Sequence, residues 1–233
     1  GDFILEFFRS ELLQLKSELK SEYPDIFIIM GNDDPRSEES KFEQLDYENL
    51  WHYVHCRRIE FAGFNIIGYS YIPPTPFLLK DWEKYDVSVF VDPGCIHPTS
   101  GYRSVEAKED ISFTNIKKDL VKLSENLDFD KSIFLFHTPP YKTYLDRAAL
   151  DGKKIDHVPL DVHVGSIAVQ RFIKSNQPYL TLHAHVHESS SITGDWKQVF
   201  NKTTSCSAAY EKEKLALISF YLEDLSGIER RLI

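Results

Sequence analysis

Three short, largely apolar runs that end in polar side chains constrain the fold of this chain most. They span residues 26–30, 132–136 and 179–182. A run of four or five residues that is apolar on both faces is typical of a central strand covered on both sides. Polar turn or ligand-type residues follow each run, so chemistry-bearing side chains stand where the strands end.

Helical periodicity occurs between these runs. Asp2 can cap a helix that extends to Leu19, and we expect the apolar face of that helix to pack on a sheet. Further amphipathic helices are predicted over residues 115–127 and from Ser166 onward. Residues 60–71 contain two glycines among β-branched and aromatic residues, which indicates a strand pair or a bent strand.

The alternation of helices and strands predicts an α/β fold, in which functional sites gather at the carboxyl ends of the strands. The C-terminal part, including residues 215–222, is rich in strand-forming residues. A chain of 233 residues with 42% hydrophobic content is long enough to bury a full core. We therefore expect a single domain over residues 1–233.

The net charge of -9 argues against nonspecific binding to nucleic acids or anionic membranes, because the long-range field repels both. No run approaches the roughly 18 apolar residues of a membrane span. The three cysteines show no metal-binding spacing and indicate free thiols in a reducing compartment. We expect a soluble, cytoplasmic protein whose oligomeric state the sequence leaves open.

Three histidines at alternate positions form the strongest motif. His183, His185 and His187 follow the third apolar run. In an extended segment, side chains at alternate positions project to one face, so three imidazoles could approach one metal ion. Isolated surface or half-buried histidines are the alternative interpretation, which three residues in register make less favourable.

The ends of all three predicted strands carry metal-ligand residue types. In an α/β sheet these ends can lie side by side, so residues far apart in sequence could share one site. Mixed oxygen and imidazole donors suit Mn, Fe or Zn better than Mg or Ca. The residues concerned are Asn32, Asp33 and Asp34, then His137, and then the three histidines at 183, 185 and 187.

Taken in order, these segments resemble the third, fourth and fifth motifs of the calcineurin-like metallophosphoesterases. The resemblance implies a four-layer α/β/β/α sandwich and a dinuclear metal centre that hydrolyses phosphoesters. A hydroxide held between two metals about 3.5 to 4 Å apart would attack phosphorus. The matching segments are Gly31-Asn32-Asp33-Asp34, Phe136-His137-Thr138-Pro139-Pro140 and Ala184-His185-Val186-His187-Glu188-Ser189.

The family pattern also implies individual roles. Asn32, His137 and His185 would bind the second metal, and His187 the first. The family's bridging aspartate corresponds to Asp2 by type and spacing, although a simple helix cap explains Asp2 equally well.

This sequence departs from the family at three points. The first family motif, Asp-x-His on the first strand, is missing, so we expect the domain to lack its first strand unless an upstream segment supplies it. Asp33 occupies the catalytic position where the family usually has a histidine that assists the leaving group. A carboxylate can do this only when protonated. Ala184 replaces the usual glycine, which the backbone can accept if φ is negative there.

Other residues are candidates for substrate binding. Arg36 could bind a substrate phosphate, or it could be a solvated surface arginine. His163 lies in a polar loop that could line the cleft, and Gly165-Ser166 could present backbone N–H groups to an anion. His183 is expected to support the metal ligands or to pack beside them.

These observations predict metal-dependent hydrolysis of a small phosphomonoester or phosphodiester with two divalent metal ions. The alternative is a catalytically inactive scaffold of the same fold that binds a partner protein, through residues 73–82 for example. An Asp-x-His motif upstream of Gly1 would favour the enzyme, and its absence the scaffold.

Overall fold

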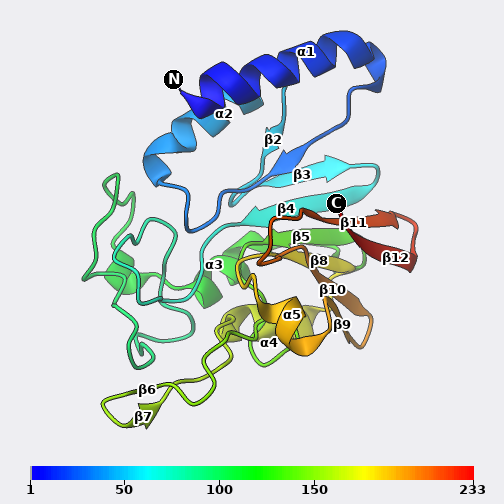
Figure 1. The fold of residues 1–233 in the computed structure, drawn as a ribbon. Coiled ribbons are helices and arrows are strands. Elements are labelled where there is room, and N and C mark those ends of the chain that lie inside the picture. The colour runs from blue at the N-terminus through cyan, green and yellow to red at the C-terminus, as the bar shows by residue number, and fades with distance from the viewer. Residues whose placement is uncertain (1) are drawn as a thin grey trace.

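The computed structural model describes residues 2–233 and shows a mixed α/β arrangement around a six-stranded sheet (Figure 1). Four central strands, β4, β5, β8 and β10, are parallel, and antiparallel strands close both edges. In spatial order, the strands are β3 (Arg58–Phe61), β4 (Phe64–Tyr69), β5 (Ser132–Phe136), β8 (Leu180–His183), β10 (Thr203–Ser207) and β9 (Lys197–Phe200).

Three further strand pairs accompany this sheet. The parallel pair is β1 (Phe27–Ile28) with β2 (His52–Tyr53), and the antiparallel pairs are β6 (Lys154–Ile155) with β7 (Val158–Pro159) and β11 (Ala216–Tyr221) with β12 (Asp224–Leu232). The β6–β7 hairpin is an arm that projects from the body of the molecule (Figure 1). All residues from 151 to 159 are exposed, and the arm turns at Asp156 and His157, whose φ angles are +46° and +69°.

The helices are α1 (Arg9–Leu19), α2 (Glu39–Tyr47), α3 (Ile116–Leu123), α4 (Ile167–Asn176) and α5 (Ser189–Thr193). Three of them were predicted, namely α1, α3 and α4, whereas α2 and α5 were not. A π-helical segment, η1 (Phe3–Phe8), leads into α1, and the single 3-10 turns are η2 (Lys20–Glu22), η3 (Arg36–Glu38), η4 (Ile111–Phe113) and η5 (Phe129–Lys131).

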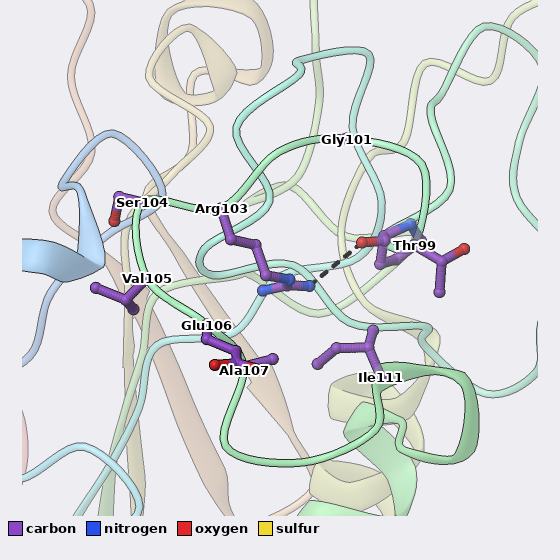
Figure 2. A pocket seen from close by; sticks show the side chains of 9 residues that line it. Thr99, Gly101, Arg103, Ser104, Val105, Glu106, Ala107 and Ile111 are labelled. Carbon is purple, nitrogen blue, oxygen red and sulfur yellow. Dashed lines mark hydrogen bonds between the residues drawn. The ribbon is translucent and has the colours of Figure 1, made fainter.

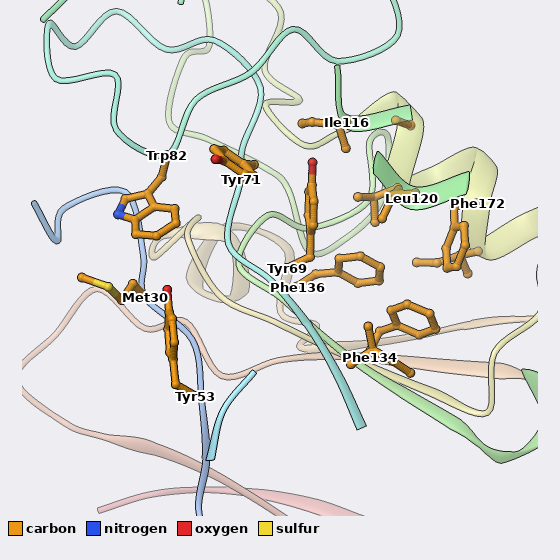
Figure 3. Packing of buried hydrophobic residues seen from close by; sticks show 14 of the residues in the cluster. Met30, Tyr53, Tyr69, Tyr71, Trp82, Ile116, Leu120, Phe134, Phe136 and Phe172 are labelled. Carbon is orange, nitrogen blue, oxygen red and sulfur yellow. The ribbon is translucent and has the colours of Figure 1, made fainter. Parts of the chain in front are cut away.

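The sheet separates two hydrophobic clusters. On one face, Phe134 and Phe136 of β5 pack against Phe172 of α4, together with Ile116 and Leu120 of α3 (Figure 3). On the other face, the β11–β12 hairpin covers Ile66, Ile133 and Leu180. Both faces of the central strands are therefore buried, which explains why their sequences are apolar at consecutive positions.

Most predicted elements are confirmed. The strand pair predicted over residues 60–71 is the β3–β4 hairpin of residues 58–69. Its turn places Ala62 and Gly63 at φ angles of +49° and +79°, as a two-residue turn of the primed type requires. Asn115 and Ser166 cap α3 and α4 through their side-chain oxygens. The first apolar run forms only the two-residue strand β1, which is half-buried.

The N-terminal helix corrects one expectation. Helical structure begins after Asp2 and ends at Leu19, but none of its residues is buried. Leu5 and Leu12 contact the core, whereas Phe8 and Leu15 remain 41% and 38% exposed. The strand pair beside this helix is only two residues long in each strand, so the helix extends beyond the surface that could cover it.

The described residues arrange helices, a sheet and a hairpin in layers, and the four-layer sandwich stays a prediction. Within residues 2–233, no helix combines the length and the apolar character that crossing a membrane requires.

Candidate functional site

Three side chains from distant parts of the sequence meet at Asn32. The amide oxygen Oδ1 of Asn32 lies 2.7 Å from His137 Nε2 and 2.8 Å from His185 Nδ1. An amide oxygen only accepts hydrogen bonds, so both imidazoles donate to it. The three residues follow β1, β5 and β8, and the predicted convergence of strand ends is confirmed for them.

The two imidazoles of this cluster are uncharged at neutral pH. Burial lowers the pKa of His137 to about 3, with smaller contributions from the neighbouring His185 and His187. Burial also lowers the pKa of His185 to about 4. A neutral imidazole carries a lone pair on one ring nitrogen, and this is the form that binds divalent metal ions.

Gly31 permits the close approach of His137. A Cβ atom on Gly31 would lie 2.7 Å from His137 Cε1 and 3.0 Å from Nε2. The backbone of the turn after β1 therefore packs directly on the imidazole ring. The sequence motif contained this glycine, but no local signal showed that its partner lies more than 100 residues further on.

The histidine run does not form one extended row. Strand β8 ends at His183, and the next histidine, His185, has a left-handed backbone with a φ of +69°. Such a conformation is uncommon outside glycine and gathers at functional sites. Ala184 is not among the residues with positive φ, so a side chain is accepted there without strain. The expectation that alternate histidines share one strand face is wrong, because the strand stops too early.

His183 connects the end of β8 with the segment that follows β5. Its buried imidazole donates from Nδ1 to the carbonyl oxygen of Thr138, at 2.9 Å, and its Nε2 lies 2.8 Å from Thr181 Oγ1. Thr181 in turn contacts Ser205 Oγ at 2.6 Å. Both ring nitrogens are thus occupied within the fold, which agrees with the expected supporting role.

Two further predicted residues lie beside the cluster. Asp33 is exposed, and its carboxylate accepts a hydrogen bond of 3.0 Å from Asn32 Nδ2. This bond fixes the amide so that Oδ1 faces the histidines. His187 is exposed in the turn before α5, and it adds a small contribution to the lowered pKa of His137 and of His185 that burial mainly causes.

The donor set at Asn32 is small. Within residues 2–233, no three His, Cys, Asp or Glu side chains form a group that could hold a metal ion. The cluster instead combines two imidazoles with one amide oxygen.

Comparison with known proteins identifies the fold alone. No family model matches the chain, and no curated protein matches it. A solved crystal structure is similar over 96% of this chain and 71% of its own, with a TM-score of 0.52 and 20% identity. The crystal structure of TT1561 from Thermus thermophilus aligns over 96% of this chain and 79% of its own, with a TM-score of 0.49 and 15% identity. The first similarity supports the mixed α/β fold.

The structure does not bring Asp2 to the Asn32 cluster. Asp2 Oδ1 accepts hydrogen bonds of 3.0 Å from the backbone N–H groups of Ile4 and Leu5, and Oδ2 pairs with Lys41 at 2.6 Å. These bonds and the lysine lower the pKa of Asp2. Asp2 therefore has the position of a helix cap, and the predicted metal bridge does not match its contacts.

Arg36 is not a solvated surface arginine. Its side chain is 12% exposed and pairs with Glu39 at 2.9 Å. It also donates to Tyr71 Oη at 2.6 Å and lies 4.9 Å above the ring of Trp82. These internal partners occupy the guanidinium that was predicted to bind substrate.

The ring of His163 contacts Asp146 and not the Asn32 cluster. Its Nδ1 is 2.8 Å from Oδ1 of Asp146, a carboxylate with no exposed surface. Asp146 also accepts hydrogen bonds from the backbone N–H groups of Lys142, Thr143 and Gly165. A buried carboxylate thus fixes the ring, a relation the sequence did not reveal because 17 residues separate the partners.

The N-terminal N–H groups of α4 bind a carboxylate of the protein itself, that of Asp86. Asp86 accepts hydrogen bonds from the N–H groups of Ile167 and Ala168, at 2.7 and 3.2 Å, and from the Ser166 hydroxyl at 2.5 Å. The N–H of Gly165 donates to Asp146. Of the two predicted N–H groups, that of Gly165 donates to the Asp146 carboxylate and that of Ser166 donates to the Pro139 carbonyl oxygen, so both are occupied within the protein.

Proposed function

We propose that this protein is a metal-dependent phosphoesterase of the calcineurin-like type, built on a variant of the four-layer sandwich. The observation that carries the proposal is the convergence of His137 and His185 on the Asn32 amide. The order of the three sequence motifs supports it independently.

The donor chemistry of this cluster fits a divalent metal ion such as Mn, Fe or Zn. The two histidine nitrogens lie 2.7 and 2.8 Å from the same amide oxygen and donate to it. With each ring proton moved to the other ring nitrogen, the freed lone pairs and the amide oxygen would surround one ion after small side-chain shifts. Two bound metals would supply a hydroxide nucleophile and neutralise charge on the phosphoryl group.

The chain's own residues would prepare this site. Asp33 holds the Asn32 amide with its oxygen inward, and His183 holds the loop after His137 against β8. Asn32 is neutral, so it adds a donor without reducing the positive charge of the metal. His187 would ligate the other metal, and Asp33, when protonated, would assist the leaving group.

Changing His185→Ala tests this proposal. Purified protein is loaded with Mn, Fe or Zn, its metal content is measured by elemental analysis, and hydrolysis of a generic aryl phosphate diester is followed. We expect the variant to lose metal and at least tenfold in rate, about 1.4 kcal/mol of transition-state stabilisation. His52→Ala is the matched control, because His52 pairs with Asp25 away from the cluster. Unchanged metal content and rate in His185→Ala would refute the site.

The inactive scaffold is the alternative proposal. It is favoured by Phe77 and Leu78, which are 61% and 58% exposed within residues 73–82. Trp82 does not contribute to such a surface, since it is 1% exposed and its indole N–H donates to the Asp34 carbonyl. A full-length protein that binds no metal and hydrolyses no phosphoester would support the scaffold.

A further inference from the structure

A polar pocket lies beside His163, between the segment that follows β5 and the segment that precedes α4. Its volume is about 410 Å³, and its walls include Lys142, Arg147, His163 and Gln198. None of the residues that line it is acidic, although the chain as a whole carries a net charge of -9. We call it the His163 pocket.

The imidazole in this pocket is held in one orientation. His163 Nδ1 contacts Asp146, which is fully buried and fixed by three backbone N–H groups. With Nδ1 engaged, Nε2 is the ring nitrogen left for a ligand. It can accept from a phosphate O–H when the ring is neutral and donate to a phosphate oxygen when the ring is protonated.

Further donors surround the same space. Gln198 Oε1 accepts from the N–H of Tyr144 at 3.1 Å, which leaves the two N–H bonds of its amide nitrogen available. The guanidinium of Arg147 is fixed by the Ala148 carbonyl and by Asp151, which is 70% exposed. Lys142 lies 5.3 Å from the centre of the Tyr141 ring, and no ion pair involves it among the described residues.

We propose that the His163 pocket binds the phosphate group of a small ligand, at a site that shares no lining residue with the Asn32 cluster. Lysine, arginine, histidine and amide donors line the same pocket, and together they offer more hydrogen bonds and positive charge than a single carboxylate needs. Lys142 follows His137 by five residues, so their Cα atoms are at most about 18 Å apart. Phosphate binding here requires no metal and would persist if the protein hydrolysed nothing.

A second pocket, lined by residues 98–111, does not share these features. It has a volume of about 470 Å³, and Figure 2 shows the Arg103 side chain among its lining residues, with Thr99, Glu106 and Ile111 around it. The Arg103 guanidinium donates to three backbone carbonyls, and the Glu106 carboxylate would repel an anion. Arg103 therefore organises the surrounding loops.

Inorganic phosphate tests the proposal with the metal-free, full-length protein at neutral pH and constant ionic strength. The Hε1 signals of the histidines are followed by NMR, and the His163 signal is assigned with His163→Gln. We expect a saturable shift of the His163 signal below about 10 mM phosphate. Acetate at the same concentrations should produce no saturable shift.

Matched lysine variants identify the pocket. Lys142 and Lys20 both have a φ of +53°, and Lys20, whose ψ is -113°, serves as a control for replacing a lysine at a positive φ. Lys142→Asn should weaken phosphate binding at least tenfold, whereas Lys20→Asn and His185→Ala should leave it unchanged. Absence of saturation, equal binding of acetate, or loss of binding in His185→Ala but not in Lys142→Asn would overturn the proposal.

Discussion

At the scale of single residues, the contacts in the site depend on Gly31, which has no side chain. Gly31 packs on the imidazole of His137, and the same imidazole donates to Asn32. The φ of Gly31 does not lie in the left-handed region, so the requirement for glycine here is steric. Position 31 is glycine because a Cβ atom would collide with His137, and not because the backbone there needs a positive φ.

Gly31→Ala should displace His137. A new Cβ atom would meet the ring at 2.7 Å, so either the turn or the imidazole must move. We expect a loss of about 1–3 kcal/mol in the free energy of unfolding, measured with urea, and a changed His137 NMR signal. Gly227→Ala is the control, since nothing lies within 4 Å of its new Cβ atom. Equal stability of the two variants, with an unchanged His137 signal, would contradict this account.

At the scale of elements, internal carboxylates decide how loops join helices. Asp86 comes from the segment before α3 and binds the first N–H groups of α4. Burial raises the pKa of Asp86, and its hydrogen bonds to Ser166, Ala168 and Ile167 oppose that effect. The carboxylate thus connects two segments that the sequence separates by 80 residues.

Asp86→Ala should destabilise the protein. The N–H groups of Ile167 and Ala168 would lose their acceptor, while Ser166 would still cap the helix through Val169. We expect a loss of about 2–4 kcal/mol in urea unfolding, because unsatisfied buried donors cost about 1–3 kcal/mol each.

Two further variants test whether the loss of stability in Asp86→Ala comes from the lost hydrogen-bond acceptor. Asp86→Asn keeps one acceptor and should lose less stability than Asp86→Ala. Asp110→Ala removes an exposed cap of η4, where only the Ser112 N–H is affected, and should cost at most about 1 kcal/mol. A cost for Asp86→Ala no larger than that for Asp110→Ala would count against the internal cap.

For the whole molecule, buried neutral histidines link stability to pH. His55 is 8% exposed, and its Nδ1 accepts a hydrogen bond from the Ser70 N–H at 3.1 Å. Burial, with smaller effects from Arg36 and Lys84, lowers its pKa from 6.5 to about 3. Between these values the unfolded chain binds a proton that the folded protein excludes. Stability must therefore fall as pH falls through this range.

His55→Asn should remove that part of the pH dependence, since its amide oxygen can still accept from Ser70. In urea titrations, we expect wild type to lose about 1.4 kcal/mol more than this variant between pH 7.5 and 5.5. His157→Asn, on the exposed arm, controls for loss of a histidine. Identical pH slopes for wild type and His55→Asn would exclude this contribution.

The sequence predicted the elements better than their contacts. Hydrophobic periodicity located α3, α4, β5 and β8, because each buries a continuous face against the sheet. It overestimated how much of the N-terminal helix is covered, since periodicity does not report the size of the opposing surface.

Part of the candidate site could be predicted from the sequence, because its residues follow predicted strands. Asn32, His137 and His185 stand at strand ends, and parallel topology brings such ends together. The placements of Arg36 and His163 depend on Glu39, Tyr71 and Asp146, whose proximity no sequence spacing encodes. Loop contacts of this kind arise only from the complete fold.

The β6–β7 arm has a practical consequence for work on this protein. Its turn at Asp156 and His157 is exposed, and the core clusters draw no residue from residues 151–159. A fluorophore or an affinity tag attached at this turn would extend into solvent without replacing a buried side chain. The arm is therefore a position at which the protein can be labelled or immobilised without changing the Asn32 cluster or the His163 pocket.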